Sequence, residues 1–264
     1  MNKTIKSTLI AGAILVCIGL VIIIAVGFAS KWNFATIDWE EKVYECNNVE
    51  IAYINYEFSA GTLKVEYYEG DVIKVEYPHS NEFTTEFSIS HTALNIATTQ
   101  VRWYNTGFWF NKIPETRVYL PRNVIFGLDL EINAGVVEIG EGQYSKIDVE
   151  MNAGTISIDN VASSVFSLEL NAGAVNLTRI TSGEFAADIN AGSLNLKGLK
   201  CDKINLEISA GSANISVVGK KSDYTIVADV SAGSCNVTNQ LGVHYNKTLS
   251  VEVSAGSANI TFEG

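Results

Sequence analysis

Four consecutive stretches of the chain start with the same tripeptide and have the same length, and they decide the fold. They read NAGVVEIGEGQYSKIDVEM (133–151), NAGTISIDNVASSVFSLEL (152–170), NAGAVNLTRITSGEFAADI (171–189) and NAGSLNLKGLKCDKINLEI (190–208). A Ser-Ala-Gly version follows at Ser209, then at Ser231 and Ser254 after slightly longer intervals, and an outlying copy lies at Ser59. The constant interval between the first five starts indicates a repeat architecture in which each unit stacks on its neighbours.

Apolar and polar residues alternate within each unit, which is typical of strands and not of helices. In the third unit Val175 and Leu177 follow the glycine, and Phe185, Ala187 and Ile189 precede the next motif. Two such short strands cannot bury an apolar face alone, so equivalent strands of successive units are expected to pair in parallel. We therefore predict an all-β fold, a parallel β-solenoid with coils of about 19 residues. An antiparallel sandwich also has short strands and frequent turns, but it gives no reason for a strict period.

The alternation slips by one position at the motif glycine, while the motif alanine continues the inward phase of the strand before it. A slip of this kind is typical of a corner or bulge that uses the freedom of glycine at positive φ. The predicted corners are Gly61, Gly135, Gly154, Gly173, Gly192, Gly211, Gly233 and Gly256.

One outward position carries an acid in every unit. Stacked in register about 4.8 Å apart, these side chains would form an acidic column, in which repulsion raises some pKa values or attracts counter-ions. Its members are Glu131, Glu150, Glu169, Asp188, Glu207, Asp229 and Glu252, with Glu57 in the outlying copy. One hypothesis is that the column binds divalent cations or a cationic ligand such as a basic peptide. The alternative is a solvated face relieved by salt and neighbouring hydroxyl and amide groups.

A second outward column consists of asparagines. Its role is expected to be structural, because stacked asparagine side chains can hydrogen-bond along the axis. Its members are Asn176, Asn195, Asn214, Asn236 and Asn259.

The stretch at 8–29, TLIAGAILVCIGLVIIIAVGFA, is a long apolar run without a charge. As a helix this run is long enough for a hydrocarbon core of about 30 Å. Lys3 and Lys6 precede it, which favours a cytoplasmic tail at 1–7, a single-pass signal anchor and an extracytoplasmic solenoid. A cleaved signal peptide is the competing interpretation, because Gly27-Phe28-Ala29 resembles a small-residue cleavage site.

The remaining chain divides into a less regular opening part at 33–127, expected to include capping loops, and the regular repeats at 128–264. The opening part contains an aromatic cluster that either contacts a partner or the membrane, or covers the end or flank of the core. Its residues are Trp103, Tyr104, Phe108, Trp109 and Phe110. The last short strand ends near Gly264, and an uncapped parallel edge there would invite end-to-end self-association.

Several function classes are excluded or disfavoured. A net charge of −11 argues against a nucleic-acid partner, which requires clustered Lys and Arg. The three cysteines outside the apolar run lack the spacing of a zinc site. Arginines and histidines form no sequence constellation, and no nucleophile-elbow, zincin or Walker pattern occurs. We therefore expect no catalytic or cofactor-binding residues, and a polysaccharide-acting β-helix enzyme is a remote alternative.

With its Asn-Ala-Gly repeats, the strand-like stretch Arg117–Pro121 and the N-terminal apolar run, the chain resembles a bacterial putative-adhesin family of unknown function with β-strand repeats. The resemblance covers roughly 49–264 and implies a location at the cell envelope without transferable catalytic residues. We expect a non-enzymatic surface protein with an adhesive, scaffolding or ligand-binding role. A cell-wall polymer, a cationic peptide or a membrane protein would be its partner. The alternative is an envelope-stress sensor that acts through a membrane partner.

Overall fold

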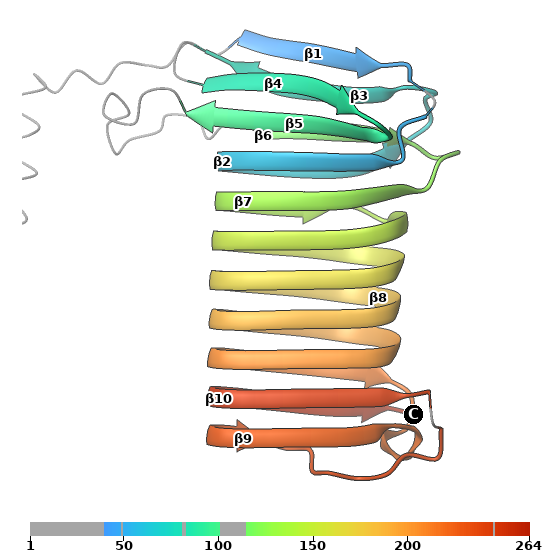
Figure 1. The fold of residues 1–264 in the computed structure, drawn as a ribbon, viewed down its shortest axis with the longest axis vertical. Helices are drawn as coiled ribbons and strands as arrows, with labels where there is room; N and C mark the ends of the chain where they lie inside the picture. The colour runs from blue at the N-terminus through green and yellow to red at the C-terminus, as the bar shows by residue number, and fades with distance from the viewer. Residues whose placement is uncertain (1–39, 49, 81–82, 101–114, 245) are drawn as a thin grey trace, which may run out of the picture. The chain divides into compact units, whose positions relative to one another are not determined.

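The computed structural model describes residues 40–48, 50–80, 83–100, 115–244 and 246–264 (Figure 1). Within these ranges the chain is almost entirely strand, with one 3-10 turn at Lys221–Asp223. The strands are β1 (Glu40–Cys46), β2 (Tyr53–Tyr68), β3 (Ile73–His79), β4 (Phe83–Ser90), β5 (Ala93–Gln100), β6 (Glu115–Pro121), β7 (Phe126–Ile139), β8 (Gly142–Val218), β9 (Thr225–Cys235) and β10 (Thr248–Glu263).

Two features predicted from the sequence lie outside the described residues: the apolar run at 8–29 and the aromatic cluster at 103–110. In the part of the chain that is described, no helix has the length and hydropathy that a membrane crossing requires.

The repeats form a parallel stack, as their period predicts. β8 winds through several coils in one continuous path (Figure 1). β7 pairs with it in parallel, and β2 pairs in parallel with β7. Gly61 lies opposite Gly135, and Gly135 lies opposite Gly154, so equivalent residues of successive units are neighbours.

A single hydrophobic core runs through the stacked coils. Equivalent inward side chains lie one above another, as do the rings of Phe166 and Phe185, whose centroids are 5.4 Å apart. Cys46 and Cys201 are buried free thiols, and burial raises the pKa of Cys201 to about 11. These cysteines therefore serve as small core residues.

The motif glycines lie at the corners, but only half of them use positive φ. Gly61, Gly135, Gly154 and Gly173 have φ values between 133° and 147°. The expectation of positive φ is wrong for Gly192, Gly211, Gly233 and Gly256. The requirement for glycine there is steric, because a Cβ would lie closer than 3.0 Å to the carbonyl oxygen of the glycine in the adjacent coil.

The motif alanines do not continue the inward phase, so that part of the prediction is wrong. Ala134, Ala153, Ala172 and Ala191 are exposed. The alternation of buried and exposed residues already breaks between the asparagine and the alanine, both of which lie outside the core, so the corner comprises the whole tripeptide and its alanine points to solvent.

The coils at the C-terminal end are not stacked in sequence order, which corrects the expected position of the open edge. β10 pairs with the last coil of β8 on one side and with β9 on the other. Figure 1 shows β9 as the outermost strand, with β10 above it. The longer repeat intervals therefore contain a displaced coil and not merely enlarged loops.

Backbone and side-chain groups of the loop after β9 cover part of the remaining edges. Ile226 and Gln240 exchange both backbone hydrogen bonds, at 2.9 and 3.0 Å. The Asn236 amide accepts a hydrogen bond from the Ile260 N–H (2.8 Å) and donates one to its carbonyl oxygen (2.9 Å). Asn236 thus replaces a strand neighbour for β10. Further along β9, Val230 remains 38% exposed.

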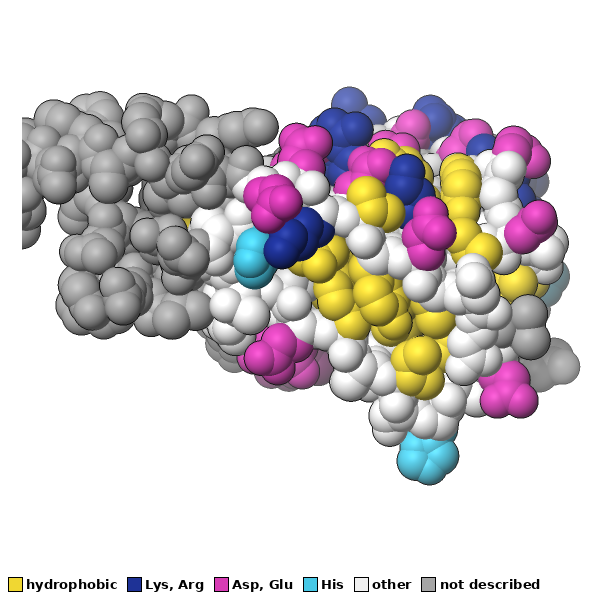
Figure 2. Space-filling view, turned by 90° about the horizontal axis from the view of Figure 1, so that it is seen from above, with side chains coloured by type: hydrophobic (Ala, Val, Ile, Leu, Met, Phe, Trp, Pro, Cys, Tyr) yellow, Lys and Arg dark blue, Asp and Glu magenta, His cyan; other side chains and the backbone are white. Residues whose placement is uncertain are grey.

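The N-terminal end is built from antiparallel strands. β1 pairs with β3, β3 with β6, and β4 with β5, all antiparallel. The rings of Tyr44 in β1 and Phe87 in β4 stack at 4.0 Å. Figure 2 shows apolar side chains in the middle of this end, bordered by charged ones. Val43 and Ile89 are among the exposed apolar residues of β1 and β4, at 55% and 46%.

One buried hydroxyl in the core is expected to reduce stability. Tyr144 is 3% exposed, and its hydroxyl has no hydrogen-bond partner among the described residues. Because an unsatisfied buried polar group is unfavourable, Tyr144→Phe should raise the free energy of unfolding by about 1 kcal/mol. Chemical denaturation measures the difference.

Tyr224→Phe is the matched control, because the buried Tyr224 hydroxyl donates a hydrogen bond to the Cys201 carbonyl oxygen at 2.7 Å. That variant should lose about 1 kcal/mol. Equal effects of the two substitutions would contradict the conclusion that the Tyr144 hydroxyl is buried without a hydrogen-bond partner in the described part of the chain.

Candidate functional site

The structure places the predicted acids in one column on the face formed by the first strand of each coil, the strand that precedes the motif. Glu57 lies opposite Glu131, and Glu131 opposite Glu150. At the other end Glu252 lies between Glu207 and Asp229, because β10 lies between β8 and β9. The axial order of the column is Glu57, Glu131, Glu150, Glu169, Asp188, Glu207, Glu252 and Asp229, because the coils of β8 stack one repeat apart.

The column is interrupted at β5, where Ala97 lies between Glu57 of β2 and Glu86 of β4. The small side chain leaves a hollow of about 210 Å³ whose walls include Glu57, Asp129 and Glu131. Asn55 donates a side-chain hydrogen bond to Asn95 at 3.0 Å on the same face. The hollow is thus acidic and rimmed with amide groups.

The carboxylates form a row and do not converge. Among the described residues, no group of three or more His, Cys, Asp and Glu side chains is arranged to hold a metal ion. Ca²⁺ requires six to eight oxygen ligands around one point, which a row with one acid per coil does not provide. The geometry therefore favours a ligand with several spaced cations over a single divalent ion.

Within the column, Asp188 is the least exposed acid. Its burial and the neighbouring charge of Glu207 both raise its pKa. The native state therefore keeps this proton at a higher pH than the unfolded chain does, so stability falls as pH rises from the ordinary Asp pKa through the raised one.

Asp188→Asn is accordingly expected to raise the melting temperature at pH 7, with the gain disappearing once the pH falls below the ordinary Asp pKa. Thermal melts of both proteins across this range provide the measurement. A gain that persists unchanged at low pH would assign the effect to packing.

An amide ladder that was not predicted from the sequence runs beside the column. The motif asparagines Asn133, Asn152, Asn171 and Asn190 are linked by side-chain hydrogen bonds of 3.0, 3.0 and 2.9 Å. In the asparagine column predicted on the other strand, Asn214 donates to Asn195 at 3.4 Å and Asn236 to Asn259 at 2.9 Å. Each rung adds a hydrogen bond along the axis and helps to fix the register of the coils.

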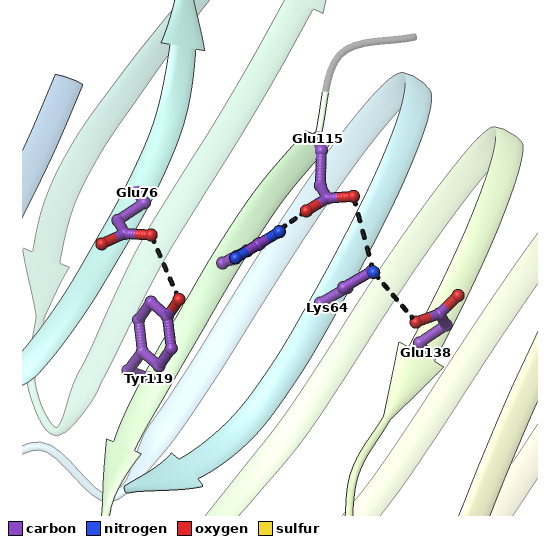
Figure 3. Close-up of polar contacts among 6 residues, drawn as sticks. Lys64, Glu76, Glu115, Tyr119 and Glu138 are labelled. Atoms are coloured by element: carbon purple, nitrogen blue, oxygen red, sulfur yellow. Dashed lines mark hydrogen bonds and ion pairs between the residues drawn. The ribbon is translucent and has the colours of Figure 1, made fainter. Parts of the chain in front are cut away.

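An ion-pair network occupies the other face near the N-terminal end (Figure 3). Lys64 contacts Glu115 at 3.5 Å and Glu138 at 3.3 Å, and Arg117 contacts Glu115 at 2.5 Å. Burial works to raise the pKa of Glu115, but Arg117 and Lys64 hold it below its usual value. Glu115 is therefore a carboxylate at neutral pH. The network joins β2, β6 and β7 and is not poised to donate a proton.

The sequence pattern alone does not reveal this network, because its members come from strands that the opening part brings together out of chain order. The one signal was the charge alternation in Glu115-Thr116-Arg117, which also suits any exposed strand.

Comparison with solved structures finds several similar bacterial proteins. A putative cell adhesion protein from Clostridium sporogenes is 16% identical, with 86% of this chain and 100% of that chain covered and a TM-score of 0.44. A putative adhesin from Bacteroides fragilis is 8% identical, with coverages of 84% and 97% and a TM-score of 0.46. One from Parabacteroides merdae is 10% identical, with coverages of 85% and 97% and a TM-score of 0.45.

No curated protein matches the sequence. The model of one protein family matches residues 51–263, which include almost all of the solenoid. The chain belongs to the Toastrack DUF4097 family.

Proposed function

We propose that the chain is a non-enzymatic surface protein of the bacterial cell envelope, whose solenoid binds a ligand through repeated side chains. The observation that carries this proposal is the in-register acidic column. Its carboxylates recur about 4.8 Å apart on a sheet that hydrogen bonds hold rigid. A row of identical groups at a fixed spacing suits an extended partner with several cations, such as a basic peptide.

Such binding is multivalent. Each exposed carboxylate contributes little by itself, but a partner held at one position presents its next cation at high effective concentration. The interaction should weaken as salt is added, because the groups are exposed and screened. Together these properties suit adhesion or sequestration.

The proposed location of the protein rests on the apolar run at 8–29. As a signal anchor it would hold the solenoid outside the membrane with residues 1–7 in the cytoplasm. A cell-wall polymer, a cationic peptide or another membrane protein would then lie within reach of the column.

The test uses the full chain reconstituted in liposomes and a labelled oligolysine as the basic-peptide probe. The triple variant Glu150→Lys, Glu169→Lys, Asp188→Lys is expected to lose at least tenfold in affinity. The control is Glu45→Lys, Glu66→Lys, Asp71→Lys, which makes the same change in net charge at exposed acids outside the column. Equal binding by the two triples would refute a role for the column.

The non-enzymatic part of the proposal has its own test. The same preparation is expected to show no turnover of peptidoglycan, teichoic acid or uronate polymers. Product formation that depends on the protein would refute it.

A further inference from the structure

The corners that follow the second strands, at the end of the coil opposite the motif, line a groove of about 450 Å³. Its walls include Tyr67, Arg122, Ile125, Glu141, Asn160 and Arg179. Glu141, Asn160 and Arg179 recur at the repeat period, so they are one coil apart and this stretch of the groove is about 10 Å long. The volume lies within the range of small-molecule sites.

The groove has a polar wall and an apolar strip. Asn160 donates a side-chain hydrogen bond to Glu141 at 3.2 Å. The Tyr67 hydroxyl donates one to the Gln143 carbonyl oxygen at 2.6 Å, which fixes the ring in place. Ile125 is 56% exposed, although it is a large apolar side chain. A ligand with many hydroxyl groups and an apolar face would satisfy both parts.

The charges in and around the groove nearly cancel. Nε of Arg122 pairs with Glu69 at 3.0 Å, and one Nη of Arg179 pairs with Asp159 at 2.6 Å. With Glu141, two guanidinium groups face three carboxylates. This balance does not favour a polyanion. Each guanidinium group, however, is paired through one nitrogen only in these contacts and keeps further donors for a neutral ligand.

Arg179 is also held in an unusual backbone conformation. Its φ is 53°, and the equivalent corner residues Asn160 and Gly198 have φ values of 55° and 74°. These three successive corners use the left-handed region, which asparagine and glycine adopt readily and arginine does not, whereas the equivalent Glu141 does not use it. Strained residues of this kind cluster at functional sites, and here the strained residue carries one of the two cations of the groove.

We infer that this groove binds a short stretch of neutral glycan. Planar amide, carboxylate and guanidinium groups can each hydrogen-bond neighbouring sugar hydroxyls. Val124, Ile125 and Ala162 also line the groove and offer apolar contact to the C–H face of a sugar ring. The inference rests on the proposed function as an envelope-binding protein and adds to it a second site of different chemistry from the acidic column.

The test measures binding of the full chain, in detergent, to an array of neutral and acidic oligosaccharides three to six sugars long. Saturable binding to a neutral oligosaccharide is expected, and Arg179→Asn should weaken it at least tenfold. Asparagine suits the corner, so the variant should melt at or above the temperature of the parent. Ile125→Ser, which alters the exposed apolar strip, should weaken the same binding.

Lys203→Asn, which removes an exposed cation elsewhere, is the control and should leave binding unchanged. Binding to acidic oligosaccharides alone, to no oligosaccharide, or equally by parent and Arg179→Asn would overturn the inference. Oligolysine binding through the acidic column is measured separately, so failure of the groove and failure of the proposed function can be distinguished.

Discussion

Replacing Gly173 with alanine is expected to lower the free energy of unfolding by about 3 kcal/mol or more. Two effects add at this position. The φ of 133° is unfavourable for any residue with a Cβ, and the new methyl group would overlap the Gly154 carbonyl oxygen of the adjacent coil. Backbone atoms on both sides are fixed by strand pairing, so the overlap cannot be relieved by a side-chain rotation.

Two other glycines separate these effects. Gly198 has a φ of 74°, but a Cβ there would be 3.8 Å from its nearest neighbour, so Gly198→Ala should cost only about 1 kcal/mol. Gly192 lacks the positive φ but has the close approach to Gly173, so Gly192→Ala should cost about 2 kcal/mol.

Denaturant unfolding followed by far-ultraviolet circular dichroism compares the three variants. The expected order of destabilisation is Gly173, Gly192, Gly198. If Gly198→Ala were as harmful as Gly173→Ala, conformation and not coil spacing would account for the glycine corner.

Truncation after Lys247, which removes β10, is expected to release β9 as well. β9 has β10 as its only strand neighbour in the described sheet order. Without β10, the backbone groups of β9 lose the strand with which they pair from Thr225 to Cys235. Hydrogen exchange of β9 should then approach the rate of an unstructured peptide within about tenfold, and the newly exposed edge of β8 should promote aggregation.

Deleting residues 221–246 is the informative counterpart, because it removes β9 and its loop but leaves β10. The deletion brings Gly256 to the same distance along the chain from Gly211 that separates Gly211 from Gly192, so the regular repeat period is restored. β10 would keep its register with β8, in which Leu249 lies opposite Ile204.

This deletion variant should fold and keep β10 protected from exchange, although its edge is less well covered than in the parent. If it unfolded as extensively as the truncation after Lys247, then β9 and not β10 would hold the end of the solenoid together.

The sequence was sufficient to predict that the coils stack, but not the order of the strands at the ends of the stack. In the middle, each coil follows the previous one after a constant length of chain, and only parallel stacking brings equivalent apolar residues together. At the C-terminal end, SAGSCNV (231–237) and SAGSANI (254–260) carry almost the same pattern. The apolar pattern alone therefore does not determine which of the two lies next to β8.

The candidate sites also differ in how far they could be predicted from the sequence. The acidic column follows from the outward phase of a regular strand and could be located from the repeat alone. The groove depends on corner residues such as Arg122 and Arg179, which lie outside that alternation. The Lys64–Glu115–Glu138 network depends on how β6 returns to β2, and a pattern of strands does not specify that path.

The displaced position of β9 has a consequence for a chain that leaves the ribosome or a translocation channel N-terminus first. Coils of β8 can be added one by one as they emerge, because each new coil pairs with one already in place. β9 emerges before β10 but can reach its native neighbour only after β10 has followed it. Until then β9 has no strand partner among the described strands. The end of the solenoid is therefore completed out of the order of synthesis, and the pairing of β9 with β10 is the folding step that must wait for the end of the chain.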